Sequence, residues 1–261
     1  MASIHTNRGI GRARRARTAL GLPPDEPLAD IVATLERLAA VHVVVLDLGD
    51  GVAGAYLRRD ACPLLFVNGR QAPARQRFTV AHEYAHHRLE HGSVVDGHNA
   101  LAGYGHDPRE VEANAFAAEL LLPRAALERL FPGLPATRLS LDDVVRIAYA
   151  FGVSAQMARI RLETCGVLAD ADHRARLDGE SAEDLHLEVA DRLGLSELDD
   201  TIAAAAAALP RLPAALDGSP LGALLAGDID VDALSQRIGR PTGAVQRMLV
   251  NLGLDELVPA A

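Results

Sequence analysis

Three residues in the first half of this 261-residue chain have the spacing of a catalytic metal site. His82, Glu83 and His86 form the pattern His-Glu-x-x-His, with Tyr84 and Ala85 at the free positions. On a helix, positions i and i+4 lie one turn apart on the same face, so both imidazoles can bind one metal ion. Glu83 lies beside them, where it can take a proton from a water that the metal activates and return it to a leaving amine. The pattern predicts hydrolytic metal chemistry; the alternative is a histidine-rich exposed helix.

A third metal ligand must come from another segment, because two histidines leave a zinc site one protein ligand short. Glu110 and Asn114 are i, i+4 neighbours in a second helical stretch, so the carboxylate can reach the metal while the amide accepts a hydrogen bond from a ligand imidazole. Glu112 is the other candidate, but a two-residue step turns about 200° around a helix, so Glu110 and Glu112 cannot both face the metal. We choose Glu110 because it shares its face with Asn114, and we expect Glu112→Ala to be tolerated. Such a site suits zinc and also manganese or iron.

These two helical stretches together resemble a known family. Through "RQRFTVAHEYAHH" and "EVEANAFAAELLLP", the segment from Arg75 to Pro123 resembles the ImmA/IrrE family of bacterial and phage metallopeptidases. Weaker similarity extends this to about residues 28–168. The resemblance implies a regulatory zinc peptidase that inactivates a helix-turn-helix transcriptional repressor by limited cleavage. By position it assigns metal ligands His82, His86 and Glu110, general base Glu83, and Asn114 as the hydrogen-bond partner of a ligand.

A different class of protein has to be weighed against the enzyme. A noncatalytic metal-bound sensor, or a DNA-binding regulator, could bind a repressor or DNA without proteolysis. Glu83 favours the enzyme, since a structural metal site needs no general base.

For three other polar residues near the motif we expect no role in metal binding. His87 points about 100° away from His86 on the helix, and His91 lies near the helix end, where a cation complements the helix dipole. We assign neither to the metal, and we expect Glu119 to lie on a solvated helix surface. Three residues of the loop between the two helices could approach the metal and assist catalysis: His98, Tyr104 and His106.

The elements that position the site are predicted to form an α+β, zincin-like domain. Three mainly apolar stretches separated by turn signals, the first of them β-branched, predict a small antiparallel meander: Val43–Leu48, Ala53–Leu57 and Pro63–Asn68. Helical periodicity and capping residues predict the helices that follow: Arg75–His91, Pro108 to Pro123 with Asp107 as cap, Arg124–Leu130, Ser140–Phe151 and Ser154–Thr164.

Charge and composition divide the chain into three predicted parts. Residues 1–27 form a basic arm that can be disordered, with five arginines and no acid in its first 20 residues. Residues 28–168 form the peptidase domain, and residues 169–261 an acidic helical domain. Residues 170–261 carry 7 arginines against 17 acids, whereas residues 1–169 carry 19 against 18. A negative field of that kind disfavours nonspecific phosphate binding.

The last helical pair has helix-turn-helix spacing, from Asp232 to Ile238, a turn at Gly239, and on to Leu252. Only three arginines are available there to meet phosphates: Arg237, Arg240 and Arg247. A protein-contact or packing module is therefore favoured over DNA contact.

Cysteine use and hydropathy indicate the compartment. Cys62 and Cys165 are far apart and neither lies in a CxxC pair, which predicts neither a disulfide nor a cysteine zinc site. We find no apolar signal segment after Arg14-Arg15, and no apolar run approaches the ~18 residues needed to cross a bilayer. We expect a soluble cytoplasmic protein with a protein partner and no membrane partner.

Overall fold

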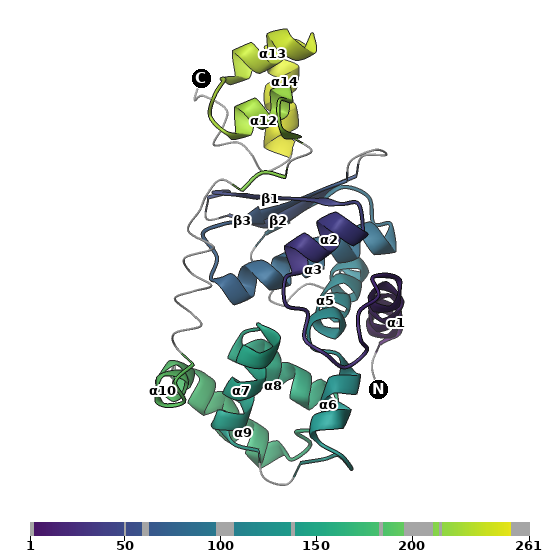
Figure 1. Cartoon of the computed structure of the whole chain (residues 1–261), viewed down its shortest axis with the longest axis vertical. Coiled ribbons are helices and arrows are strands. Elements are labelled where there is room, and N and C mark those ends of the chain that lie inside the picture. The colour runs from purple at the N-terminus through teal and green to yellow at the C-terminus, as the bar shows by residue number, and fades with distance from the viewer. Residues whose placement is uncertain are drawn as a thin grey trace.

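A computed structural model describes residues 3–49, 51–58, 63–97, 107–136, 139–182, 185–195, 211–213 and 216–251. The architecture is α+β, as the sequence predicts, with a small sheet that has helices on both faces (Figure 1). Within these ranges no helix is long and apolar enough to cross a membrane.

The sheet is mixed and has four strands in the order β1-β3-β2-β4. The strands are β1 (His42–Leu46), β2 (Val52–Leu57), β3 (Leu64–Asn68) and β4 (Val94–Gly97). β3 runs parallel to β1 and antiparallel to β2, and β4 is antiparallel to β2. The predicted meander is therefore wrong in topology. Every residue of β3 is buried, so this strand takes an interior place between β1 and β2.

The two helices that carry the candidate ligands are α3 (Pro73–Leu89) and α5 (Pro108–Leu121). Both predictions are confirmed, and so is the cap on α5, where the Asp107 side chain accepts a hydrogen bond from the backbone nitrogen of Arg109. α3 ends at Glu90, which adopts a left-handed conformation with φ 60°. α3 lies against β2 and β3, and α5 packs on α3. The face of α3 that carries the candidate ligands is thus enclosed between the sheet and α5.

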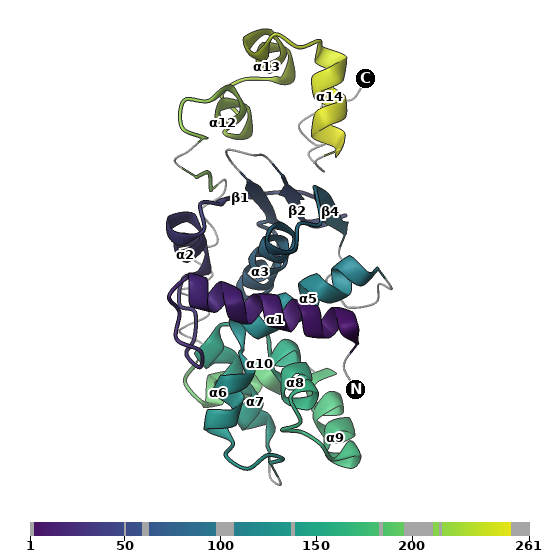
Figure 2. The same cartoon turned by 90° about the vertical axis from the view of Figure 1, so that its right-hand side faces the viewer.

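The N-terminal segment is a helix, α1 (Ile4–Ala19), so the expectation of a disordered arm is wrong. Ser3 caps it, and it lies along α5 (Figure 2). Gly9, Ala13 and Ala16 are buried in that contact, where small side chains allow a close approach. Three of its five arginines pair with carboxylates or carbonyls of the folded chain, which helps to explain why a basic segment is ordered: Arg8 with Glu112, Arg14 with Glu119, and buried Arg17 with the backbone oxygens of Pro23, Glu26 and Leu120.

The remaining helices pack into two hydrophobic clusters on opposite sides of the sheet. The first cluster includes α2 (Ile31–Leu38) and reaches the helices drawn below the sheet in Figure 1: α6 (Arg124–Leu130), α7 (Leu141–Phe151), α8 (Ala155–Thr164), α9 (Ala171–Ala182) and α10 (Leu185–Arg192). The second covers the other face with α12 (Pro220–Leu225), α13 (Val231–Ile238) and α14 (Thr242–Asn251).

The described residues after 168 therefore do not share one core of their own. Leu177 and Val189 belong to the first cluster, whereas Leu225 and Leu249 cover Phe66 of the sheet in the second. A boundary near residue 168 does not separate two cores, because helices on both of its sides bury the same apolar surface. The alanine-rich stretch from Leu198 to Leu209, whose composition predicts a further helix, lies outside the described residues.

Two glycines of α1 provide a test of its contact with α5. A Cβ added at Gly9 would overlap the backbone oxygen of Glu112, whereas one added at Gly11 meets nothing within 4 Å. Gly11→Ala should therefore raise the free energy of unfolding, by up to about 1 kcal/mol, because alanine favours helix. Gly9→Ala should lower it by about 1–3 kcal/mol, because the helices must move apart. Urea unfolding of both variants measures the difference, and equal shifts would contradict the α1–α5 packing.

Candidate metal centre

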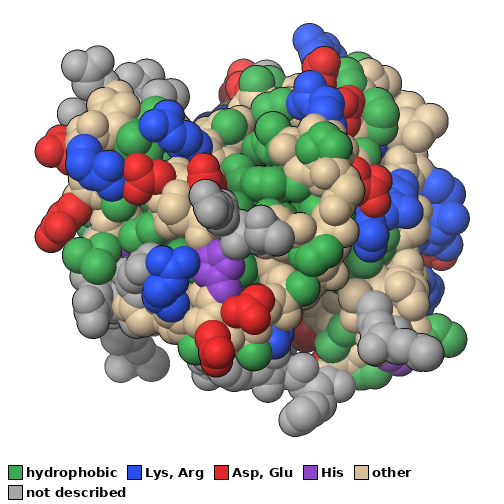
Figure 3. Space-filling model, turned by 90° about the horizontal axis from the view of Figure 1, so that it is seen from below, with side chains coloured by type: hydrophobic (Ala, Val, Ile, Leu, Met, Phe, Trp, Pro, Cys, Tyr) green, Lys and Arg blue, Asp and Glu red, His purple; other side chains and the backbone are tan. Residues whose placement is uncertain are grey.

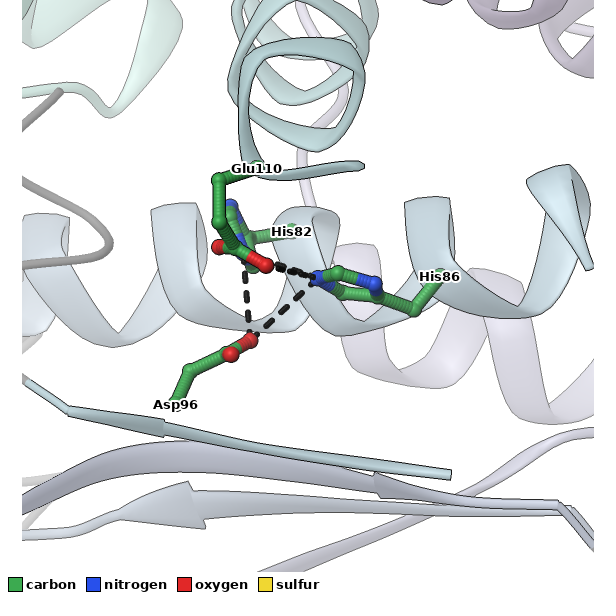
Figure 4. A group of neighbouring side chains, drawn as sticks. All are labelled: His82, His86, Asp96 and Glu110. Carbon is green, nitrogen blue, oxygen red and sulfur yellow. Dashed lines mark hydrogen bonds and ion pairs between the residues drawn. The ribbon is translucent and has the colours of Figure 1, made fainter. Parts of the chain in front are cut away.

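Helix α3 places His82 and His86 on one buried face, with their Nε2 atoms 3.1 Å apart. Glu110, in the first turn of α5, brings Oε2 to 3.2 Å from His82 Nε2 and Oε1 to 3.6 Å from His86 Nε2. Figure 4 shows the three side chains converging from the two helices. The structure thus brings together the three residues that the sequence predicts as ligands.

A fourth side chain, Asp96, joins them from β4 (Figure 4). Its Oδ2 lies 3.2 Å from His82 Nε2 and 3.3 Å from His86 Nε2. Sequence reasoning missed Asp96 because it assigned residues 92–107 to a loop. The only local signal was the β-branched pair Val94-Val95, which is too short to predict a strand.

The outer nitrogens of both imidazoles are engaged elsewhere. His82 Nδ1 lies 3.0 Å from Asn114 Oδ1, the contact that the sequence predicts for this amide. His86 Nδ1 lies 2.9 Å from Nδ1 of His91. Asn114 Oδ1 can only accept, so His82 carries its proton on Nδ1, and His86 can donate to His91 in the same way. Both Nε2 atoms then present lone pairs to the centre.

The chemistry of this donor set fits a divalent cation. Two lone-pair nitrogens and two carboxylates converge in a buried space, which is unfavourable unless a positive charge lies between them. Ligand atoms about 2.0–2.1 Å from a tetrahedral zinc ion lie about 3.3–3.4 Å from one another. The separations between the ligand atoms of this site, from 3.1 to 3.6 Å, lie close to that value. Histidine and carboxylate ligands suit zinc, manganese and iron.

The side chain of Glu83 is fully buried beside the ligands, and neither of its carboxylate oxygens has a hydrogen-bond partner among the described residues. Gly54 of β2 leaves room for it, since an added Cβ there would lie 2.5 Å from Glu83 Oε1. Burial raises the pKa of Glu83 well above its usual range, and the charges of Asp96 and Glu110 raise it further. Once ionised, such a carboxylate is a strong proton acceptor.

The charges of the site also act on the ligands. Burial lowers the pKa of His82, but Asp96 and Glu110 outweigh it, so that the pKa is raised overall. Burial raises the pKa of the Asp96 carboxyl, but hydrogen bonding and charge from His82 and His86 outweigh it and hold that pKa well below its usual range. The Asp96 carboxylate thus stays ionised where a cation would bind.

Comparison with known proteins agrees with this geometry. Residues 38–163 match the model of the Peptidase_M78 family, described as the IrrE N-terminal-like domain. The resemblance indicated by the two helical motifs is confirmed over this segment. The chain is also similar to "Uncharacterized immunity region protein 2" of Bacillus phage phi105, with 28% identity over 121 residues, which cover 46% of this chain and 72% of the relative. The family match supports a metallopeptidase domain over residues 38–163.

Helix α1 lies outside the segment that matches the IrrE N-terminal-like domain, but it contributes to the surroundings of His86. His91 Nε2 lies 3.1 Å from Glu112 Oε2, and Glu112 in turn binds Arg8 at 2.8 Å and His5 Nδ1 at 2.9 Å. A chain of hydrogen bonds therefore runs from His86 through His91 and Glu112 to α1. Such partners fix the tautomer and the orientation of a metal-binding imidazole.

This chain of contacts corrects two expectations. His91 does not merely complement the end of a helix, because its side chain is buried against His86. Glu112 does not face the metal, yet its buried carboxylate joins three elements, so the premise that Glu112→Ala is harmless does not hold. Glu112 pairs with His5 and Arg8, which lie more than 100 positions away in the sequence. Helical periodicity alone does not reveal such contacts.

The other predicted residues of the IrrE N-terminal-like segment have simpler outcomes. His87 points away from the metal ligands to the hydroxyl of Tyr56, 3.0 Å away. Glu119 is buried between Arg14 and Arg161, so the expectation of a solvated surface position is wrong. His98, Tyr104 and His106 lie outside the described residues.

Glu112 and Glu119 form a matched pair that tests the role of Glu112. Both are buried on α5 and both pair with an arginine of α1, but only Glu112 reaches a ligand imidazole through His91. Glu112→Gln should weaken metal binding by up to about tenfold, the lower end of the effect of losing a direct partner of a ligand, because Glu112 acts through His91. Glu119→Gln should lower stability but leave the metal affinity of the folded protein unchanged. Chelator competition with Zn²⁺ measures this; equal affinities for both variants would assign Glu112 to packing alone.

Proposed function

We propose that this protein is a zinc-dependent endopeptidase that acts in regulation by limited cleavage of a helix-turn-helix transcriptional repressor. One observation carries the enzymatic part: Glu83 is a buried carboxylate without a hydrogen-bond partner in the described chain, beside a cluster of metal-binding side chains. Burying such a group is costly, and a purely structural metal site gains nothing from it. The Peptidase_M78 match and the phage immunity relative support the same class of activity.

In this proposal each side chain of the site has a defined task. His82, His86 and Glu110 would hold the ion, which when bound polarises the scissile carbonyl and lowers the pKa of water. Glu83 accepts the proton of the attacking water and passes it to the nitrogen of the leaving amine. Asn114 and His91 keep the two imidazoles oriented. The buried surroundings strengthen each of these electrostatic interactions.

A noncatalytic metal-bound sensor is the alternative, and one observation favours it. Asp96 brings the number of converging protein groups to four, and zinc sites with four protein ligands are usually structural. A DNA-binding regulator has weaker support. The helical pair α13–α14 covers the sheet with its buried side, and only three arginines of the pair and its turn can meet phosphates: Arg237, Arg240 and Arg247.

Replacement of the base separates these alternatives. Glu83→Gln keeps the shape of the side chain but cannot take up a proton, so the cleavage rate should fall by about two to four orders of magnitude. Bound zinc should remain at one ion per chain, as measured by elemental analysis of the dialysed protein. The control is the double variant His82→Ala/His86→Ala, which should lose the metal. Cleavage by Glu83→Gln at the normal rate would remove Glu83 from the mechanism.

A repressor substrate is proposed from the family resemblance and from charge. The surplus of 17 acids over 7 arginines in residues 170–261 complements a basic DNA-binding protein. On the face of the molecule shown in Figure 3, acidic and arginine side chains are interspersed and do not gather into one acidic patch. A charge surplus of this kind acts mainly on the encounter rate, and most strongly at low salt.

Incubation with the repressor encoded beside this protein's gene tests the substrate. We expect two defined repressor fragments, whose formation a chelator abolishes and added Zn²⁺ restores. Unfolded casein should remain intact, because limited access to a buried metal requires a fitting segment. Broad digestion of casein would contradict the selectivity. An intact repressor together with zinc binding by the protein would support the sensor.

A further inference from the structure

Asp96 reaches the metal-binding cluster from the edge of the sheet. In the described sheet, β4 pairs only with β2, and the register shifts between Val52 and Gly54, where Gly54 pairs with Asp96. Val95 is 40% exposed, whereas Asp96 is 3% exposed. The alternation of β4 thus directs one carboxylate inward, onto the buried face of α3 (Figure 4).

The Asp96 carboxylate is the fourth of four buried side chains whose ligand atoms all lie within 4.8 Å of one another. Its Oδ2 lies 3.2 and 3.3 Å from the Nε2 atoms of His82 and His86, much as the Glu110 oxygens do at 3.2 and 3.6 Å. Apart from these two imidazoles, this oxygen has no hydrogen-bond partner within the described ranges. Nothing else therefore accounts for its burial. A catalytic zinc site normally has three protein ligands and keeps its fourth position open for water or substrate.

We propose that Asp96 is a fourth protein ligand that closes the metal site in the resting protein, and that cleavage requires this carboxylate to leave. The inference rests on the proposed function, whose regulation it describes. His82, His86 and Glu110 are the permanent ligands, and Asp96 is the exchangeable one. A resting peptidase closed in this way would not cut unrelated proteins.

The elements that carry the four ligands differ in how easily they can move. The permanent ligands come from α3 and α5, two helices that pack on each other and on the sheet or α1. Asp96 comes from a four-residue strand with one pairing partner and a register irregularity. An edge strand gives up fewer hydrogen bonds when it shifts, and bulges of this kind often lie next to active sites. Displacement of Asp96 is thus the least costly way to open the site.

The test compares Asp96→Ala and Asp96→Asn with Val95→Ala, a control on the same strand whose side chain is partly exposed. Loss of a direct ligand should weaken Zn²⁺ binding at least about tenfold, the lower end of the effect of losing even an indirect partner. In the Co²⁺-loaded protein, the visible absorption should change because the ion exchanges a carboxylate for water. Peptidase activity per bound zinc should rise in both Asp96 variants. Val95→Ala should match the unchanged protein in all three measurements.

The outcomes distinguish this inference from the proposed function. Weaker zinc binding and an altered Co²⁺ spectrum, with no repressor cleavage by any form, would keep Asp96 as a ligand and overturn the peptidase. Unchanged zinc affinity and an unchanged spectrum in both Asp96 variants would overturn the fourth ligand, even if the protein cleaves repressor. Weaker binding with activity per bound zinc unchanged or reduced would overturn the closing role.

Discussion

Buried, electron-rich groups converge around His82 and His86, and the structure depends on a positive charge that compensates them. Two imidazole nitrogens and the carboxylates of Glu110 and Asp96 meet within a few ångströms in a space closed to solvent, and Glu83 is buried beside them. Without a compensating positive charge this arrangement would be among the most costly in the molecule. A divalent cation satisfies it at once. The packing of α3 against the sheet and against α5 therefore encloses a group of donors that fits a divalent cation.

The residues that support the ligand imidazoles extend beyond the segment that matches the family. α1 lies outside residues 38–163, yet it donates Arg8 and His5 to Glu112, which holds His91 against His86. The helix approaches α5 closely through small residues such as Gly9, and this closeness lets its arginines reach carboxylates that are themselves buried. The N-terminal helix is therefore part of the surroundings of the metal site and not an appended arm.

Local features of the sequence predicted the two ligand helices and the residues they bring together. The i, i+4 spacing, the cap at Asp107 and the turn of about 200° between Glu110 and Glu112 are properties of one helix at a time, so they can be evaluated without a fold. Asp96 and Glu112 were missed or misjudged because their roles arise from contacts between distant segments. The order of the strands was wrong for the same reason. A run of apolar residues shows that a strand is buried but not which strand lies beside it.

Gly54 lies next to both Glu83, the proposed base, and Asp96, the proposed exchangeable ligand. It pairs with Asp96 across the sheet, and its missing side chain leaves the space that Glu83 Oε1 occupies, while the backbone oxygen of Phe66 and the methyl group of Thr79 close the other sides. The base and the proposed exchangeable ligand thus lie against the same short stretch of β2. A shift of β4 that withdraws Asp96 would remove one negative charge from the neighbourhood of Glu83 and open room beside it. One movement at the sheet edge would then both free a position at the metal and prepare the base that has to act there.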